Sequence, residues 1–274
     1  MSTATGVIHL EKLTMRYTGG GGISSVSFSV PEGSSLSVIG SSGCGKTTLA
    51  HLIAGLLEAQ SGKCTIPTGH RISLVQQKDA LFPWLSARKN IELGAGGHRR
   101  RGGEGRQDQF KAQANDLSRK MGISQCMDRY PAQLSGGERQ RVSIARALMS
   151  GADILILDEP CAALDAFTRE RLQDLLLELQ QERRLTAIYI THNIEEALFL
   201  SPRIMVMGQG RVHAMVENSM FPDSGARTRQ EFYARVLELR RVLDEAAPAL
   251  DAAATERKEE YSILNQRSER NHEE

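Results

Sequence analysis

The stretch that most limits what this chain can fold into is SLSVIGSSGCGKTT, residues 35 to 48. An apolar strand pattern is followed by a turn of the form GxxxxGK[ST] and then by helical spacing. In that order, the turn presents backbone amides to phosphate oxygens at the positive end of a helix. The stretch therefore predicts an α/β fold that binds a nucleoside triphosphate, and its context makes a chance glycine turn a poor alternative.

Two side chains at the end of this turn have specific predicted roles. Lys46 would reach the β- and γ-phosphates, and the hydroxyl of Thr47 would hold Mg²⁺. We expect the whole turn to contact the nucleotide. Its residues are Gly40, Ser41, Ser42, Gly43, Cys44, Gly45, Lys46, Thr47 and Thr48.

Cys44 lies inside this turn and allows two interpretations. It is either a small, inert filler or a thiol whose pKa is lowered by the helix N-terminus. The chain has three further cysteines, Cys64, Cys126 and Cys161, and no CxxC spacing. Zinc and disulfide interpretations are therefore weak, and we expect reduced thiols.

Polar residues end two of the buried strand patterns. In ILILDEP, Asp158 and Glu159 are adjacent, so their side chains point apart and can divide two tasks. We assign Asp158 to Mg²⁺ and Glu159 to the attacking water, against the alternative of an acidic turn. His192 ends AIYITH at the edge where open α/β sheets bind ligands, so a neutral imidazole there could contact the γ-phosphate and the water.

Two other residues carry a weaker signal. Gln77 follows the strand pattern RISLVQQ, and its carboxamide could bind Mg²⁺ or water. Tyr17 precedes the GGGG run and could stack on adenine, although a core tyrosine fits the pattern equally well.

A second glycine turn, LSGGERQRVSIARAL, begins at Leu134 and contains no lysine. Ser135 and Glu138 form an S-x-x-E capping box, and Gly136 and Gly137 leave room for a phosphate at the helix N-terminus. One site does not need two such turns from distant segments. A second copy of the chain, related by a two-fold axis, could bring its Ser135–Gly137 turn to the exposed side of the γ-phosphate.

Composition excludes several classes of function. The 274 residues have a formal net charge of +1, which gives no sign of a nucleic-acid partner. No apolar run approaches the ~18 residues of a membrane span. The start, MSTATGVIHL, lacks the pattern of a secretion signal, and we expect a soluble cytoplasmic protein.

The hydropathy pattern predicts the order of the elements along the chain. We expect a β-rich start over 7–39, a helix over 47–57 with Leu56 on its apolar face, and a basic loop over 94–107. A helical pattern over 109–148, a closing hairpin over 203–217 and a helix over 231–243 follow. The expected domains are an ATPase domain over 1–215 with a helical subdomain at about 80–150, a helical extension over 216–247, and a frayed tail over 248–274.

Together, these motifs resemble the ATPase subunits of ATP-binding-cassette (ABC) transporters over about residues 7–215. GSSGCGKTT is similar to their Walker A motif, ILILDEP to Walker B, and LSGGERQR to the signature motif. The resemblance implies a P-loop NTPase fold with an N-terminal antiparallel β subdomain and a helical signature subdomain. It also implies ATP and Mg²⁺ as cofactors. Finally, it implies functional roles for Glu159, His192, Gln77, Tyr17 and Asp165.

Each of these roles follows from a matched position. Glu159 corresponds to the catalytic glutamate and His192 to the switch histidine. Gln77 corresponds to the Q-loop glutamine, Tyr17 to the adenine-stacking aromatic, and Asp165 of AALD to the D-loop aspartate. The chain departs from the usual pattern at Gln76, Ala162 and Asn193. None of these departures removes a phosphate or metal ligand, so we expect an active ATPase.

LFPWLSARKNI and RTRQEFYARVLELRRVL further resemble the nitrate/sulfonate/taurine importer ATPases. This likeness implies an ATP-dependent dimer at the cytoplasmic face of the membrane. Integral membrane permease subunits and, indirectly, an extracytoplasmic binding protein would be its partners. Phe82, Pro83 and Trp84 become candidates for the permease-docking groove, with satellite core packing as the alternative.

Several alternatives stay open at this stage. The solute could be a sulfonate, taurine, nitrate, bicarbonate or a pyrimidine precursor. Rival functions are a soluble ABC-type ATPase acting on a macromolecule, an exporter ATPase, and a simple P-loop kinase or switch. The absence of coiled coils and tandem cassettes from the sequence disfavours the first, and the signature string disfavours the last.

Overall fold

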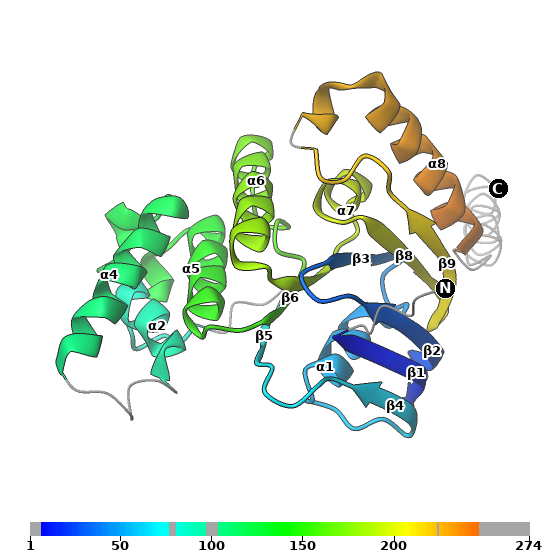
Figure 1. Cartoon of the computed structure of the whole chain (residues 1–274), viewed down its shortest axis with the longest axis horizontal. Coiled ribbons are helices and arrows are strands. Elements are labelled where there is room, and N and C mark those ends of the chain that lie inside the picture. The colour runs from blue at the N-terminus through cyan, green and yellow to red at the C-terminus, as the bar shows by residue number, and fades with distance from the viewer. Residues whose placement is uncertain (1–6, 77–80, 97–103, 224, 247–274) are drawn as a thin grey trace, which may run out of the picture.

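A six-stranded sheet forms the centre of the computed structural model, which describes residues 7–76, 81–96, 104–223 and 225–246 (Figure 1). Its strands, in spatial order, are β5 (Ile72–Val75), β6 (Ile154–Asp158), β7 (Thr186–Ile190), β3 (Ser35–Gly40), β8 (Arg203–Gly208) and β9 (Arg211–Glu217). All neighbours are parallel except β8 and β9, which form the predicted closing hairpin. The strands β3, β6 and β7 are buried along their whole length, as expected for a parallel sheet covered on both faces.

The register of the central strands determines where the site forms. Val38 of β3 and Asp158 of β6 both lie opposite Ile190 of β7. The three strands therefore end at the same edge of the sheet. This brings the chain segments after Gly40, Asp158 and Ile190 together, as the sequence predicted.

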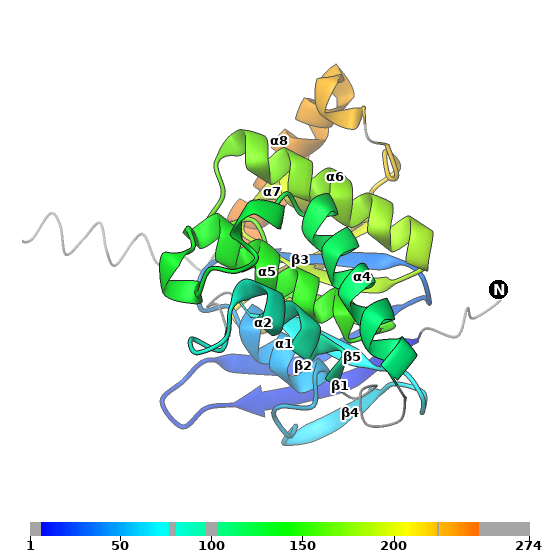
Figure 2. The ribbon, with the colours of Figure 1, turned by 90° about the vertical axis from the view of Figure 1, so that its left-hand side faces the viewer.

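A second, three-stranded sheet is antiparallel, with the order β2 (Gly22–Val30), β1 (Ile8–Arg16), β4 (Ser61–Thr65). The predicted N-terminal antiparallel subdomain is confirmed. It takes its third strand from residues 61–65, however, because β3 joins the central sheet. Helix α1 (Lys46–Ile53) lies between the two sheets, and its buried face shares one hydrophobic cluster with both (Figure 2).

The remaining helices cover the other surfaces of the central sheet. The helical group at one end consists of α2 (Ala87–Gly94), α4 (Glu104–Lys120) and α5 (Gly136–Met149) (Figure 1). The others are α6 (Ala166–Arg183), α7 (Ile194–Leu200) and α8 (Gln230–Ala246), with short 3₁₀ turns at Ser124–Cys126, Pro131–Gln133 and Ala226–Thr228. None of the helices in this described part of the chain has the length and apolarity that a membrane crossing demands.

Three boundaries differ from those predicted. Helix α1 ends at Ile53, before Gly55 with its left-handed φ of 70°, so Leu56 is 60% exposed rather than part of an apolar face. Helix α4 begins at Glu104, inside the predicted basic loop. The helical pattern over 109–148 is interrupted between Lys120 and Gly136. The predicted tail over 248–274 lies outside the described residues.

Candidate active site

The first glycine turn has a backbone that only glycine can adopt at one position. Gly45, the N-cap of α1, has a φ of 102°. A Cβ there would lie 2.6 Å from the carbonyl oxygen of Gly22 and 2.7 Å from Ile23 Cγ2. Gly43 is also left-handed, with a φ of 79°, but a Cβ at this position would meet nothing within 4 Å. The two glycines therefore serve different needs: Gly43 sets a dihedral angle, and Gly45 also permits close packing.

Lys46 extends across this turn. Its Nζ donates hydrogen bonds to the carbonyl oxygens of Gly40 and Ser41, at 2.7 and 3.1 Å. The ammonium group is thus held over the cradle by two neutral acceptors. Phosphate oxygens would be stronger partners for it, because their negative charge adds a Coulombic attraction that a neutral carbonyl oxygen lacks.

Thr47 and Asp158 meet at the edge of the sheet. Thr47 Oγ1 donates to Asp158 Oδ2 over 2.9 Å. Burial raises the pKa of the Asp158 carboxyl, and the negative charge of Glu159 adds to this effect. A hydroxyl and a carboxylate are the hard oxygen ligands that suit Mg²⁺, which is typically bound by one or two carboxylates together with substrate phosphates. The donor set therefore fits Mg²⁺, and the third expected ligand, Gln77, lies outside the described residues.

Glu159 and His192 are also in contact. The Nδ1 atom of His192 lies 2.8 Å from Oε2 of Glu159, whose side chain is only 10% exposed. Glu159 has a left-handed backbone with a φ of 53°, and its N–H donates to the carbonyl oxygen of Ile190 over 2.8 Å. A non-glycine residue in this conformation is uncommon, and the hydrogen bond to Ile190 helps to hold it there.

This contact bears on the role predicted for His192. Because the carboxylate of Glu159 can only accept, a hydrogen bond between the two groups needs the hydrogen on Nδ1 of His192. A neutral ring then presents a bare Nε2, which cannot donate to a phosphate oxygen. While Nδ1 stays bonded to Glu159, Nε2 can donate to a phosphate oxygen only if the imidazole carries both hydrogens. A neutral ring would first have to leave Glu159.

Tyr17 lies beside the cradle. Its hydroxyl accepts a hydrogen bond from Thr48 Oγ1 over 3.5 Å, and its side chain is 43% exposed. The exposure rules out the core-tyrosine interpretation and leaves the ring available for stacking on a planar group.

The expectation of a low pKa at Cys44 is wrong. The side chain is 4% exposed, and burial raises the pKa of the thiol, although the nearby charge of Lys46 opposes the shift. Burial disfavours the thiolate more than the ammonium favours it. The structure therefore supports the inert-filler interpretation.

The second glycine turn forms the predicted capping box. Ser135 Oγ accepts from the N–H of Glu138 at 3.2 Å, and the Ser135 N–H donates to Glu138 Oε2 at 2.8 Å. The backbone N–H of Ser135 also lowers the pKa of Glu138. A Cβ at Gly137 would lie 2.6 Å from Leu164 Cδ2, so this glycine is also needed for packing within the chain.

The turn lies beside the loop that carries Asp165. A Cβ at Gly136 would be 3.5 Å from Ala163 Cβ. Exposed Asp165 caps α6, because its carboxylate accepts from the N–H of Thr168 over 3.0 Å. No hydrogen bond or ion pair between described residues joins the Ser135–Gly137 turn to Gly40–Thr48. The chain thus brings Asp165 to the second turn and keeps both away from the first cradle.

Sequence reasoning missed a buried pair behind His192. Thr191 Oγ1 donates to Glu196 Oε2 over 2.6 Å, and the Asn193 N–H donates to Thr191 Oγ1 over 3.0 Å. Asn193 also caps α7 by accepting from the Glu196 N–H over 3.1 Å. The cap could be read from the sequence, since Asn precedes an acidic first turn. Nothing in the adjacent Glu195 and Glu196 indicates which of the two is buried.

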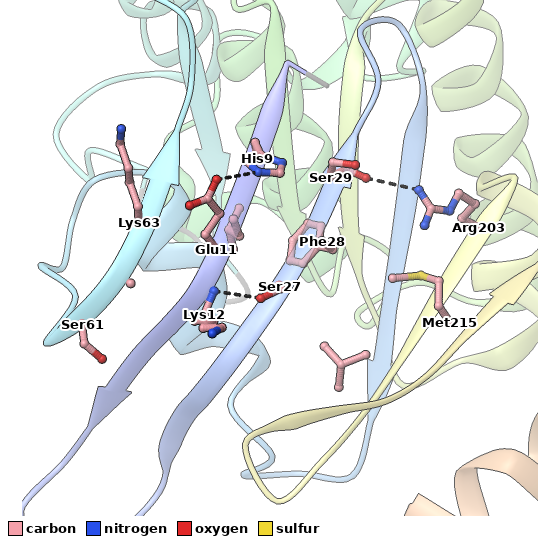
Figure 3. A pocket seen from close by; sticks show the side chains of 13 residues that line it. His9, Glu11, Lys12, Ser27, Phe28, Ser29, Ser61, Lys63, Arg203 and Met215 are labelled. Atoms are coloured by element: carbon pink, nitrogen blue, oxygen red, sulfur yellow. Dashed lines mark hydrogen bonds and ion pairs between the residues drawn. The ribbon is translucent and has the colours of Figure 1, made fainter. Parts of the chain in front are cut away.

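A further hollow lies elsewhere (Figure 3). It is an open depression of about 990 Å³ over the antiparallel sheet and the β8–β9 hairpin, with Phe28 and Met215 in its lining. His9 and Glu11 pair across 3.0 Å at its edge, and Arg203 donates to the carbonyl oxygen of Ser29 over 3.2 Å. None of the described nucleotide ligands predicted from the sequence lines it.

A GxxxxGK[ST] turn after a central strand, with a hydroxyl and two acidic side chains at the same sheet edge, defines the class of P-loop nucleoside triphosphatases. The comparisons narrow this class. The family model described as ABC transporter matches residues 23–162, about half of the chain. The chain therefore belongs to the ABC transporter family, and its activity is ATP hydrolysis.

Several relatives share this family. The taurine import ATP-binding protein of Rhizobium johnstonii is 42% identical over 69% of this chain and 73% of its own length. The aliphatic sulfonates import ATP-binding protein of Bacillus cereus is 36% identical over 79% and 87%. The bicarbonate transport ATP-binding protein of Synechocystis is 39% identical over 76% and 74%.

A solved structure supports the same fold. The ATP-binding cassette MJ0796, in a dimeric post-hydrolysis state bound to ADP and phosphate, is 29% identical with a TM-score of 0.72. The alignment covers 78% of this chain and all of that chain. None of the relatives named here supports a macromolecule-directed ATPase or an exporter.

Proposed function

We propose that this chain is the ATPase subunit of an importer and that two copies close head to tail around ATP. The observation that carries this proposal is the separation of the two glycine turns. The Ser135–Gly137 turn opens helix α5 with the N-terminal amides of a capped helix, yet within one chain it packs on Ala163 and Leu164 rather than on the cradle. The positive N-terminal end of α5 would therefore contact a γ-phosphate only if that phosphate is bound to a second copy of the chain.

Each protomer would contribute two sets of residues to the composite sites. The residues Gly40 to Thr48, with Tyr17 against adenine, would hold the nucleotide on one side. Ser135, Gly136, Gly137 and Asp165 of the other copy would close the site. Thr47, Asp158 and Gln77 would hold Mg²⁺, which supplies positive charge to the β- and γ-oxygens when bound.

Glu159 would orient the attacking water, because its carboxylate lies at the strand end next to the metal ligands. Its pairing with His192 gives the site a resting arrangement, in which the carboxylate is occupied by the imidazole. Release of this contact would free Glu159 for water and His192 for the γ-phosphate. A single local rearrangement would thus assemble the hydrolytic site.

An exposed aromatic pair favours a membrane subunit as partner. Phe82 and Trp84 lie with ring centroids 5.4 Å apart, and Trp84 is 69% exposed, which disfavours core packing. Phe82 borders a groove of about 410 Å³ that is also lined by Leu74, Leu93 and Arg146, from β5, α2 and α5. Such a groove fits a short helix with an apolar anchor, which a permease would present at the cytoplasmic face of the membrane.

The transported solute would be a small anion. Taurine, aliphatic sulfonates and bicarbonate, which appear in the names of the relatives, are small solutes that carry an anionic oxygen group. An extracytoplasmic binding protein would deliver it to the permease, so the solute would not touch this chain.

Reconstitution tests this proposal. The chain is coexpressed with the membrane proteins encoded beside its gene and placed in proteoliposomes with the neighbouring binding protein. We expect ATP-dependent uptake of a sulfonate or a comparable anion. Trp84→Ala should weaken copurification with the membrane proteins and leave the ATPase activity of the isolated chain unchanged, whereas Tyr233→Ala on exposed α8 serves as the matched control. Copurification with soluble proteins alone would contradict the proposal.

A further inference from the structure

Glu196 is a carboxyl group buried behind the active site, on the first turn of α7. Its side chain is 2% exposed. One oxygen, Oε2, accepts the hydrogen bond from Thr191 Oγ1, whereas Oε1 is buried without a hydrogen-bond partner among the described residues. A buried carboxyl with an incompletely satisfied oxygen is costly to the fold. Its cost suggests a function in the site rather than in stability.

The contacts of Glu196 surround the switch histidine. The carboxyl holds Thr191, the backbone N–H of Glu196 holds the side chain of Asn193, and the backbone N–H of Asn193 holds Thr191. His192 lies between these two residues; its side chain is 71% exposed, and its Nδ1 contacts Glu159. The direction of the imidazole is therefore determined largely by the turn beneath it.

The same carboxyl faces the loop after Glu159. Cys161 is 2% exposed, and burial first and then the negative charge of Glu196 raise the pKa of its thiol. Burial likewise raises the pKa of Glu196. Tyr189 of β7 and Arg169 of α6 are the other titratable groups that act on this position, apart from Glu159.

Cys161 belongs to the short segment between Glu159 and Asp165. The Leu164 N–H donates to the Cys161 carbonyl oxygen over 3.2 Å, and the Ala162 N–H donates to that of Glu159 over 3.3 Å. These bonds make the segment a compact turn.

We propose that Glu196 is a positioning residue of the ATPase, whose buried carboxyl holds Thr191 and thereby fixes the turn that carries His192. The inference rests on the proposed role of His192 at the γ-phosphate. Glutamine retains an oxygen that accepts from Thr191, whereas leucine fills the space and leaves the Thr191 hydroxyl without its acceptor.

The experiment compares Glu196→Gln, Glu196→Leu and Thr191→Val in the full-length chain. We measure kcat, KM for ATP and the Kd of a fluorescent ATP analogue. We expect Glu196→Leu and Thr191→Val to lower kcat about tenfold or more with Kd within about twofold, because the cradle is untouched. Glu196→Gln should retain most of kcat. The double variant Thr191→Val/Glu196→Leu should be no slower than Glu196→Leu, since both remove one shared contact.

The matched control is Glu195→Leu, because Glu195 is the exposed neighbour on the same turn. It should leave kcat unchanged. If Glu196→Leu does not fold, Thr191→Val still removes the contact with an isosteric side chain. Wild-type kcat in Thr191→Val, or a Glu196→Gln variant as slow as Glu196→Leu, would overturn the inference.

His192→Ala, measured in parallel, separates this inference from the proposed function. If His192→Ala hydrolyses ATP at the wild-type rate, the proposed role of His192 fails, and the inference fails with it. If His192→Ala is inactive while Glu196→Leu and Thr191→Val are fully active, only the inference about Glu196 fails.

Discussion

Thr47 and Asp158 stand 111 residues apart in the sequence and are joined by a hydrogen bond of 2.9 Å. Thr47 lies in α1, directly after β3, and Asp158 ends β6; β7 stands between β3 and β6 in the sheet. The two oxygens meet only because the three strands end in register. This relationship links the phosphate cradle to the acidic strand end and makes one site of two motifs.

The raised pKa of Asp158 predicts that removing its charge stabilises the fold but abolishes ATP hydrolysis. Because its pKa is raised in the folded chain, ionising it costs free energy of folding, and the cost grows as pH rises above about 3.9. We expect Asp158→Asn to increase the free energy of unfolding relative to wild type, with a gain that is small near pH 4 and larger at pH 8. The same variant should lose Mg²⁺-dependent ATP hydrolysis. Urea unfolding at several pH values and an ATPase assay check both expectations.

Asp244→Asn is the control for charge alone, because Asp244 is exposed on α8. Its effect on stability should be small at every pH. An Asp158→Asn variant less stable than wild type at pH 8 would show that the carboxylate stabilises the fold, contrary to this prediction.

The two left-handed glycines of the cradle should respond differently to a methyl group. Gly43→Ala should lower the free energy of unfolding only by the strain of alanine in the left-handed region, about 1–2 kcal/mol. Gly45→Ala also forces a Cβ to within 2.6 Å of the Gly22 carbonyl oxygen, and we expect a total cost of about 3 kcal/mol or more. Denaturant unfolding of both variants measures the difference, and equal costs would contradict the packing argument.

Cys44 should react slowly with alkylating reagents. Its pKa is raised by burial, so the reactive thiolate is scarce at neutral pH and increases only at pH values above those of a free thiol. We expect iodoacetamide to modify Cys44 at pH 8 about tenfold more slowly in the folded chain than in guanidinium, as followed by mass spectrometry. Once formed, the adduct should block ATP hydrolysis, and Mg·ATP should slow its formation. Equal rates in the folded and unfolded chain would show that the thiol is accessible and activated.

The positions of the motif residues could be predicted because their signals are local. A capping box is a four-residue pattern, and Ser135 and Glu138 form it as predicted. The ends of buried parallel strands converge on one edge by a general rule, which is why Asp158 and His192 could be assigned to one site. The signal for the end of α1 is local as well, because Gly55 stops the helix. The hydropathy pattern alone wrongly extends the helix to include Leu56.

Other features depended on contacts that no local pattern encodes. The burial of Cys44 arises from its packing against Gly40 and the neighbouring strand β8, which outweighs the effect of the helix end. The contact of His192 Nδ1 depends on Glu159, a residue 33 positions earlier in the sequence. Glu196 is buried because α7 packs against β3, β8 and α6, and this burial has no sequence signature.

The composite site is the central claim, and Glu159→Gln tests it most directly. This variant should bind ATP without hydrolysing it, so the closed dimer should accumulate. Light scattering after size exclusion should give twice the mass of the chain with Mg·ATP, and the mass of one chain with Mg·ADP. Adding Lys46→Ala or Ser135→Arg to Glu159→Gln should abolish the dimer, because each removes one half of every site. A Glu159→Gln chain that stays monomeric in saturating Mg·ATP, or a dimer that tolerates Ser135→Arg, would contradict the account.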